Sequence, residues 1–136
     1  MTEAHTGNEL KLMLNGEKPL SMFYYCKAVG DKEMLPIDDF SPYVQEGRIV
    51  MEEFDAPLPS DADPKYRLTY VLYALVHEKW RISAMTVALT AQSDNIQKPD
   101  EGIDRIIGLL LGYPKPEIEA WIRSGVDKGV YNKNYK

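Results

Sequence analysis

The side chains that most often bind metals or act as nucleophiles are scarce in this chain, which has two histidines, His5 and His77, and one cysteine, Cys26. A tetrahedral zinc site takes four nitrogen or sulfur ligands, so these residues cannot build one within a single chain. The segment 77–81 (HEKWR) begins like the zinc-protease motif H-E-x-x-H, but Arg81 stands where the second histidine must be. We therefore expect neither a metal nor a cofactor.

Carboxylates are plentiful, and the adjacent pairs Asp38-Asp39 and Glu52-Glu53 contain the residue types that glycoside hydrolysis uses as acid and base. Neighbours on a strand point to opposite faces, so the members of such a pair cannot converge on one bond. The segment 61–63 (DAD) begins like a calcium loop, but Leu72 replaces the glutamate required at the twelfth position. A small hydrolase or transferase stays an alternative if its site assembles carboxylates and tyrosines that are distant in sequence.

Tyrosines provide a second kind of candidate. Tyr66 and Tyr70 fall on one face of a predicted strand, and Tyr73 falls on the other. Two aromatic side chains on an exposed sheet face could stack on bases or hold a peptide, whereas the same pattern is also ordinary sheet packing. With three residues from the C-terminal part of the chain they form our candidate binding surface, which comprises Tyr66, Tyr70, Tyr113, Lys115 and Arg123.

The most specific pattern is that of residues 107–122 (IGLLLGYPKPEIEAWI), which resemble a helix-turn-helix. Gly108 stands where two helices would cross, and Gly112 stands where the chain would turn. This resemblance implies a DNA-binding regulator. However, Glu117 and Glu119 open the second helix and would repel the phosphates that supply most of the affinity for DNA. We therefore predict a structural helical hairpin, keep the regulator as an alternative, and do not expect nucleic acid as a partner.

Length and composition predict one globular domain over residues 1–136, with frayed ends at about 1–7 and 130–136. Hydrophobic residues make up 44% of the chain and charged residues 27%, which is too apolar for general disorder. The formal net charge is −5, an acidic balance that disfavours binding to nucleic acid and to anionic membranes.

Cysteine use and hydropathy favour a cytoplasmic protein. A single cysteine cannot form an intrachain disulfide, and its apolar neighbours predict that it packs as a small hydrophobic residue. The N-terminal segment is polar, without the apolar core of a signal peptide. The longest uncharged runs, 68–76 and 82–93, are shorter than the roughly 20 residues of a membrane-spanning helix.

The first half of the chain is predicted to be mostly strands. A short helix over 9–15 precedes strands at 20–29, 48–55 and 66–76. The charges of 48–55 suit an edge position, and the apolar run 66–76 suits the centre of the sheet. The stretch from Pro36 to Phe40 is expected to be irregular, and Ser41-Pro42 to start a single helical turn that Gly47 closes. Residues 56–64, rich in proline and aspartate, are expected to form a loop.

The second half is predicted to be helical. Helices over 78–92, 101–111 and 117–124 are bounded by an Asp100 cap and by Gly112 and Gly125 at helix ends. The breadth of apolar residues in 78–92 indicates a helix buried on more than one side. The fold expected is α+β, a small antiparallel or mixed sheet of about three strands packed on one face by a C-terminal cluster of helices. The predicted core comprises Leu72, Trp80, Ile82, Met85, Leu89, Ile103, Ile106, Ile107, Leu110, Leu111, Ile118, Trp121 and Ile122.

The sequence has no recognisable motif of catalytic or metal-binding residues. This favours a small non-catalytic binding or regulatory protein, such as an adaptor, an inhibitor or an immunity-type partner. Its expected partner is another protein or a second copy of itself, and the edges of a three-stranded sheet could accept a strand from that partner.

Overall fold

The fold is that of a computed structural model, which describes residues 7–58, 61–94 and 98–131. Within these ranges the chain forms a three-stranded antiparallel sheet and five α-helices, three of them C-terminal, which confirms the α+β prediction. The predicted frayed ends fall almost entirely outside the described residues, as does part of the predicted 56–64 loop. None of the described helices combines the length and the apolar character that crossing a bilayer requires.

The sheet has the order β1-β3-β2, with β1 at Leu20–Cys26, β2 at Ile49–Asp55 and β3 at Leu68–Leu75. Both outer strands run antiparallel to β3, so that Leu72 lies opposite Met22 on one side and Glu52 on the other. The four consecutive residues 71–74 of β3 are all buried. This confirms the predicted central position of the apolar strand and the edge position of the charged one.

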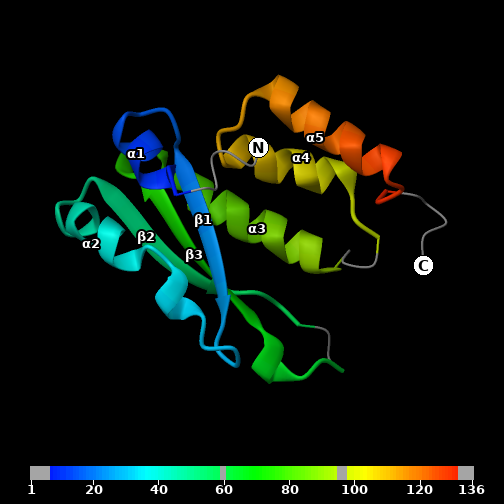
Figure 1. The fold of residues 1–136 in the computed structure, drawn as a ribbon, viewed down its shortest axis with the longest axis horizontal. Coiled ribbons are helices and arrows are strands. Elements are labelled where there is room, and N and C mark those ends of the chain that lie inside the picture. The colour runs from blue at the N-terminus through cyan, green and yellow to red at the C-terminus, as the bar shows by residue number, and fades with distance from the viewer. Residues whose placement is uncertain (1–6, 59–60, 95–97, 132–136) are drawn as a thin grey trace.

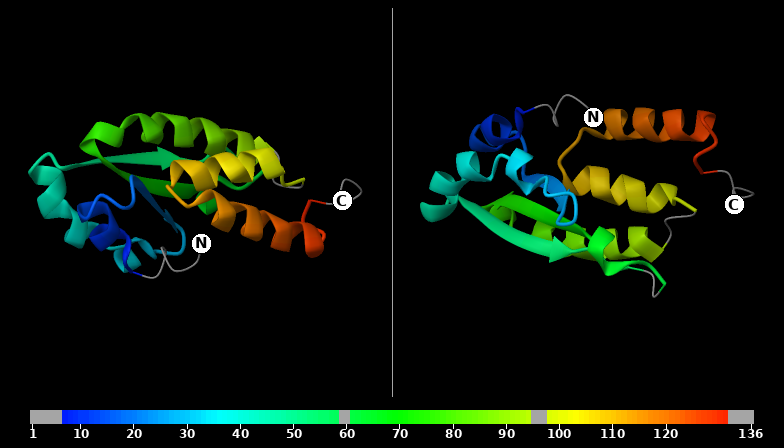
Figure 2. Two further views of the ribbon diagram at one scale, coloured as in Figure 1. Left: turned by 90° about the horizontal axis from the view of Figure 1, so that it is seen from above. Right: turned by 60° about the horizontal axis from the view of Figure 1, so that its bottom comes forward.

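The central strand is buried on both sides because helices cover both faces of the sheet (Figures 1 and 2). Leu72 and Ala74 pack against the C-terminal helices, whereas Val71 and Tyr73 pack in a second cluster on the opposite face. That cluster is closed by α1 (Glu9–Leu14) and α2 (Ile37–Gln45). The prediction of helices on one face only was therefore wrong, and the sheet is the middle of three layers.

Helix α2 begins at Ile37, four residues before the start predicted at Ser41. Pro42 then lies inside the helix, where its missing N–H removes one backbone hydrogen bond. Burial of Phe40 offsets this loss, because its ring stacks on that of Tyr73 with 4.0 Å between the ring centroids. Tertiary packing thus overrides the local preference of Pro42 for the first turn of a helix.

The C-terminal helices are α3 (Trp80–Asp94), α4 (Glu101–Leu110) and α5 (Lys115–Asp127). The Asp100 cap is confirmed, since its Oδ1 accepts a hydrogen bond of 2.9 Å from the backbone N–H of Ile103. Gly125 does not end α5 as predicted. A Cβ there would stand 2.7 Å from the ring of Tyr131, so the glycine allows the aromatic ring to pack against the helix.

The main core lies between the sheet and the three C-terminal helices. Eight of the predicted core residues are buried there, namely Leu72, Ile82, Met85, Leu89, Leu110, Leu111, Ile118 and Ile122. Ile103 and Ile107 are half-buried, and Trp80, Ile106 and Trp121 are exposed. Helix α3 packs against both β3 and α4, in line with its broad apolar pattern, but it keeps one exposed side that carries Trp80.

Candidate functional site

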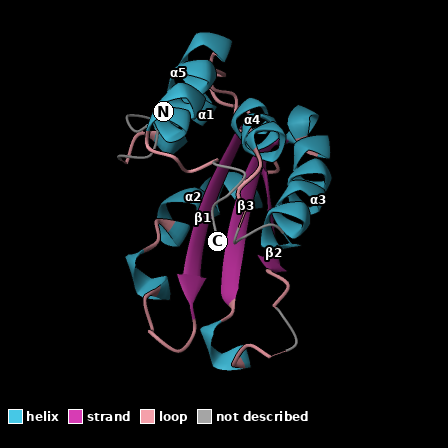
Figure 3. Ribbon diagram, turned by 90° about the vertical axis from the view of Figure 1, so that its right-hand side faces the viewer, coloured by secondary structure: helices cyan, strands magenta, loops and turns pink. Residues whose placement is uncertain are grey.

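The five residues of the predicted binding surface do not share one element or one degree of burial. Tyr66 belongs to the short helical turn η3 (Pro64–Tyr66), so it does not share a strand face with Tyr70 as predicted. Tyr70 packs against the main core, and Tyr113 is buried in the α4–α5 turn. Lys115 and Arg123 are exposed on α5, at the opposite end of the molecule from η3 (Figures 1 and 3).

Helices α4 and α5 form a hairpin whose axes run nearly antiparallel (Figures 1 and 2). Gly108 allows this close approach, because a Cβ there would stand 3.0 Å from Ile118 Cγ1. Gly112 adopts a positive φ of 85° in the turn, as the sequence predicted. Helix-turn-helix units cross at roughly 90–120°. The predicted structural hairpin is therefore the arrangement found.

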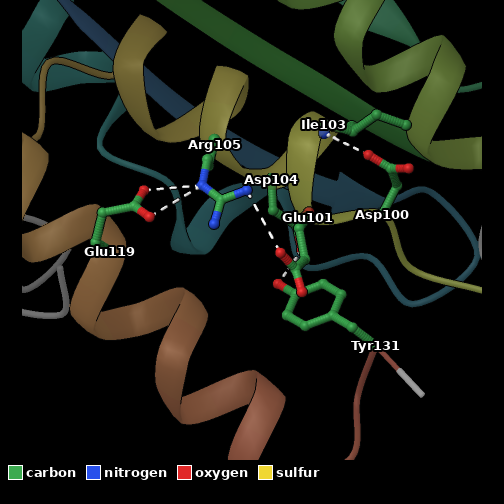
Figure 4. Close-up of polar contacts among 7 residues, drawn as sticks. All are labelled: Asp100, Glu101, Ile103, Asp104, Arg105, Glu119 and Tyr131. Carbon is green, nitrogen blue, oxygen red and sulfur yellow. Dashed lines mark hydrogen bonds and ion pairs between the residues drawn. The ribbon is translucent and has the colours of Figure 1, made fainter.

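An ion-pair network ties the hairpin together on its outer side (Figure 4). The Arg105 Nε atom donates to both carboxylate oxygens of Glu119, at 3.1 and 2.9 Å, and Arg105 Nη1 lies 3.4 Å from Glu101. These hydrogen bonds hold the pKa of Glu119 below its ordinary value. The groups are solvent-accessible, so the network aligns the helices more than it stabilises them. It also pairs Glu119, one of the two carboxylates that were expected to repel DNA phosphates.

A cavity of about 410 Å³ lies at the open end of the hairpin. Its walls include exposed Trp121 and the Tyr131 ring, and its size is in the range of small-molecule sites. The Tyr131 hydroxyl donates to the Asp104 carboxylate, and together with burial this raises the pKa of Tyr131 (Figure 4). Asp100 is engaged as the α4 cap. The carboxylates lining the cavity thus already serve the hairpin.

A buried lysine, which the sequence did not reveal, connects the sheet to the hairpin. Lys18 is 3% exposed, and its Nζ atom donates a 3.0 Å hydrogen bond to the carbonyl of Leu111. The same ammonium group lies 4.7 Å from the centroid of the Tyr113 ring. Burial lowers the pKa of Lys18 to about 8, against the opposing influence of Glu9. No local signal could have found this residue, because its partners are about a hundred positions away.

The exposed surface of α3 and α4 carries large apolar side chains. Trp80 is 57% exposed, Val87 71%, Ile106 49% and Leu109 52%. We call these four residues the outer face. No charged residue occurs between Arg81 and Asp94, so the exposed side of α3 is apolar or neutral over almost its whole length.

Arg81 fixes how the two helices meet. Its guanidinium lies over the Trp80 ring at 4.7 Å and donates to the carbonyls of Leu109 and Leu110 at 3.0 and 3.1 Å. The start of α3 therefore lies beside the end of α4. Since the helices are antiparallel, Ile106, one turn before Leu109, lies level with the second turn of α3. The outer face thus spans two neighbouring helices.

The other candidates for chemistry are separated or already engaged. Glu53 pairs with Val71 and Glu52 with Leu72, residues that point to opposite faces, as predicted for the acidic pair. Asp38 and Asp39 lie in the first turn of α2 and not on a strand. Asp63 caps η3 through the backbone N–H of Lys65. Cys26 is buried, as expected, and among the described residues no three or more metal-binding side chains form a cluster.

Comparison with protein-family models, with curated proteins and with solved structures finds no significant match to this chain.

Proposed function

We propose that this chain is a small non-catalytic binding or regulatory protein that acts in the cytoplasm and binds a protein through the outer face. One observation carries the proposal, which is the exposure of four large apolar side chains, Trp80, Val87, Ile106 and Leu109, on two adjacent helices. Single exposed apolar residues are ordinary in folded proteins, whereas a contiguous apolar area is typical of an interaction site. Tryptophan is also enriched among the residues that contribute most to binding.

The β2 edge of the sheet supports binding less well than the helices do. Strand β2 carries Glu52, Glu53 and Asp55, and charges of this kind oppose the addition of a partner strand. The outer face has no such charges, so apolar contact alone can drive association there.

The two alternatives have less support. A DNA-binding regulator would need helices that cross steeply and a basic second helix, whereas α5 runs alongside α4 and opens with Glu117 and Glu119. A hydrolase or transferase would need available carboxylates, whereas Asp100 and Asp104 in the hairpin cavity already bond to Ile103 and Tyr131.

The experiment compares proteins captured from a cytoplasmic extract by the immobilised chain and by two variants. Val87→Asp places a charge in the outer face, and Val126→Asp places the same charge at an exposed valine of α5. We expect Val87→Asp to lose captured proteins that the wild type and Val126→Asp retain, with all three folded by circular dichroism. Identical capture by all three would refute the outer face as the binding site.

A further inference from the structure

We propose that the partner on the outer face is a second copy of this chain, and that the two α3 helices pack antiparallel about a two-fold axis at Val87. The inference rests on the proposed function for the identity of the face. It adds the identity of the partner, the two-fold symmetry of the complex and the residues in contact.

Charge placement on α3 selects this arrangement. Lys79 precedes Val87 by eight residues and Asp94 follows it by seven, and both side chains are exposed. At 1.5 Å per residue the two charges lie about 12 and 10 Å from the axis along the helix. Antiparallel packing therefore brings each Lys79 near Asp94 of the other copy. Parallel packing would bring like charges together. Between the two ends the sequence has one further charge, that of Arg81, which pairs with Glu78 of the same chain.

The sizes of the side chains on α3 fit the same symmetry. Its largest exposed side chain, Trp80, lies at the first residue, whereas Ala84 near its middle is small. A two-fold axis at Val87 places each Trp80 level with Asp94, at the end of the other α3, and each Ala84 level with Thr90 of the other copy. The large side chain thus lies at the ends of the contact and smaller ones lie nearer its centre.

The extent of the face predicts a weak dimer. Two helices about 10 Å wide and about 20 Å long offer on the order of 400 Å² per copy, against about 800 Å² for a standard stable interface. With a net charge of −5 on each copy, general repulsion also opposes association. We therefore expect a dissociation constant on the order of 10–100 µM, the range of a reversible contact.

Disulfide trapping tests the position of the axis. Two residues on a two-fold axis approach each other, and a disulfide needs Cβ atoms about 3.5–4.5 Å apart. We expect Val87→Cys to form a covalent dimer under mild oxidation at least tenfold faster than Val126→Cys, the matched exposed valine on α5. The wild type should stay uncrosslinked, because Cys26 is buried. Equal rates for the two variants would overturn the proposed axis.

A charge exchange tests the pairing. Lys79→Glu and Asp94→Lys should each raise the dissociation constant, measured by sedimentation velocity, roughly tenfold, because each reversal acts at both symmetry-related pairs. The double variant should return to within about twofold of the wild type. Each change puts its new charge at the helix end that favours it, so a weaker dimer cannot come from a less stable α3. Unchanged single variants, or a double variant as weak as the single ones, would refute the pairing.

The outcomes also separate this inference from the proposed function. A wild type that is monomeric at 200 µM, while Val87→Asp still loses captured proteins, refutes self-association and leaves the outer face as a site for another protein. A monomeric wild type with unchanged capture refutes both. A dimer that Val87→Asp dissociates, with Val126→Asp unaffected, supports both.

Discussion

At the scale of single residues, the Lys18 ammonium is a buried charge with a cost in stability. It is buried and held by the Leu111 carbonyl at the end of α4, where the negative end of the helix dipole favours a cation. These contacts offset its desolvation only in part, since the pKa of Lys18 is lowered to about 8. The group therefore connects the start of β1 to the hairpin while reducing stability at neutral pH.

Stability should accordingly rise with pH above 8. The unfolded chain keeps the Lys18 proton up to about pH 10.5, whereas the folded chain releases it above a pKa of about 8, so the unfolded state binds more protons in this window. We expect a gain of about 2 kcal/mol in the free energy of unfolding between pH 8 and 10. Urea unfolding at each pH measures it, and Lys18→Met should flatten the rise. A slope that persists in Lys18→Met would contradict the assignment.

The hydroxyl of Tyr73 is a buried polar group without a hydrogen-bond partner among the described residues, while the ring of Tyr73 stacks on Phe40. Burial raises the pKa of Tyr73 to about 12, so above pH 10 the folded state holds a proton that the unfolded state loses, and stability falls.

Replacing Tyr73 by Phe keeps the stacked ring and removes the unsatisfied hydroxyl. We expect Tyr73→Phe to raise the free energy of unfolding by about 1 kcal/mol and to weaken the decline above pH 10. Tyr70→Phe, at a half-buried tyrosine on the other face of the sheet, is the matched control for deleting a hydroxyl. A less stable Tyr73→Phe would mean that the hydroxyl has a partner.

At the scale of elements, α3 has two unequal sides. Leu89 is buried against the sheet, whereas Trp80 belongs to the exposed outer face. We expect Leu89→Ala to lower the free energy of unfolding by 2–5 kcal/mol and Trp80→Ala by less than about 1 kcal/mol, although tryptophan loses far more atoms. Thermal melts of dilute monomer provide the test, and equal losses would show that Trp80 is covered within one chain.

Elements with local signals were predictable from the sequence. Helix α4 has a capping aspartate, apolar residues in a helical repeat and a turn glycine, and each of these proved correct. The start of α2 was misplaced because Pro42 suits the first turn of a helix, whereas Phe40, in the preceding turn, packs against the distant rings of Tyr73 and Phe23. Trp80 and Ile106 of the outer face were predicted to be core, because a helical repeat marks apolar residues without saying which of them are covered.

The candidate site was less predictable than the fold, because its residues meet through long-range contacts. Lys18 and Leu111 lie 93 positions apart, and Arg81 reaches Leu109 across 28. A single sequence carries no pattern for such pairs. The glycines of the hairpin were the exception, since a missing side chain within an apolar helical repeat is itself a local sign of close packing.

At the scale of the whole molecule, the negative net charge opposes binding to polyanions such as DNA. We expect no measurable binding to duplex DNA at physiological salt, because the chain carries −5 and α5 opens with acidic residues. A mobility-shift titration at 150 mM salt tests this, with Arg123→Ala as the matched variant. A shift that weakens steeply with added salt and disappears in Arg123→Ala would restore the regulator alternative.

The central strand β3 is synthesised after both of the strands that it pairs with. Its pairs with β1 join residues that lie 42 to 54 positions apart, so β1 leaves the ribosome long before its only sheet neighbour exists. At about 5–20 residues per second, this uncharged strand waits for several seconds without a partner. Its sequence, LSMFYYC, is the kind that nascent-chain chaperones shield. Translation speed over residues 27–75 should therefore influence how much of the newly made protein escapes aggregation.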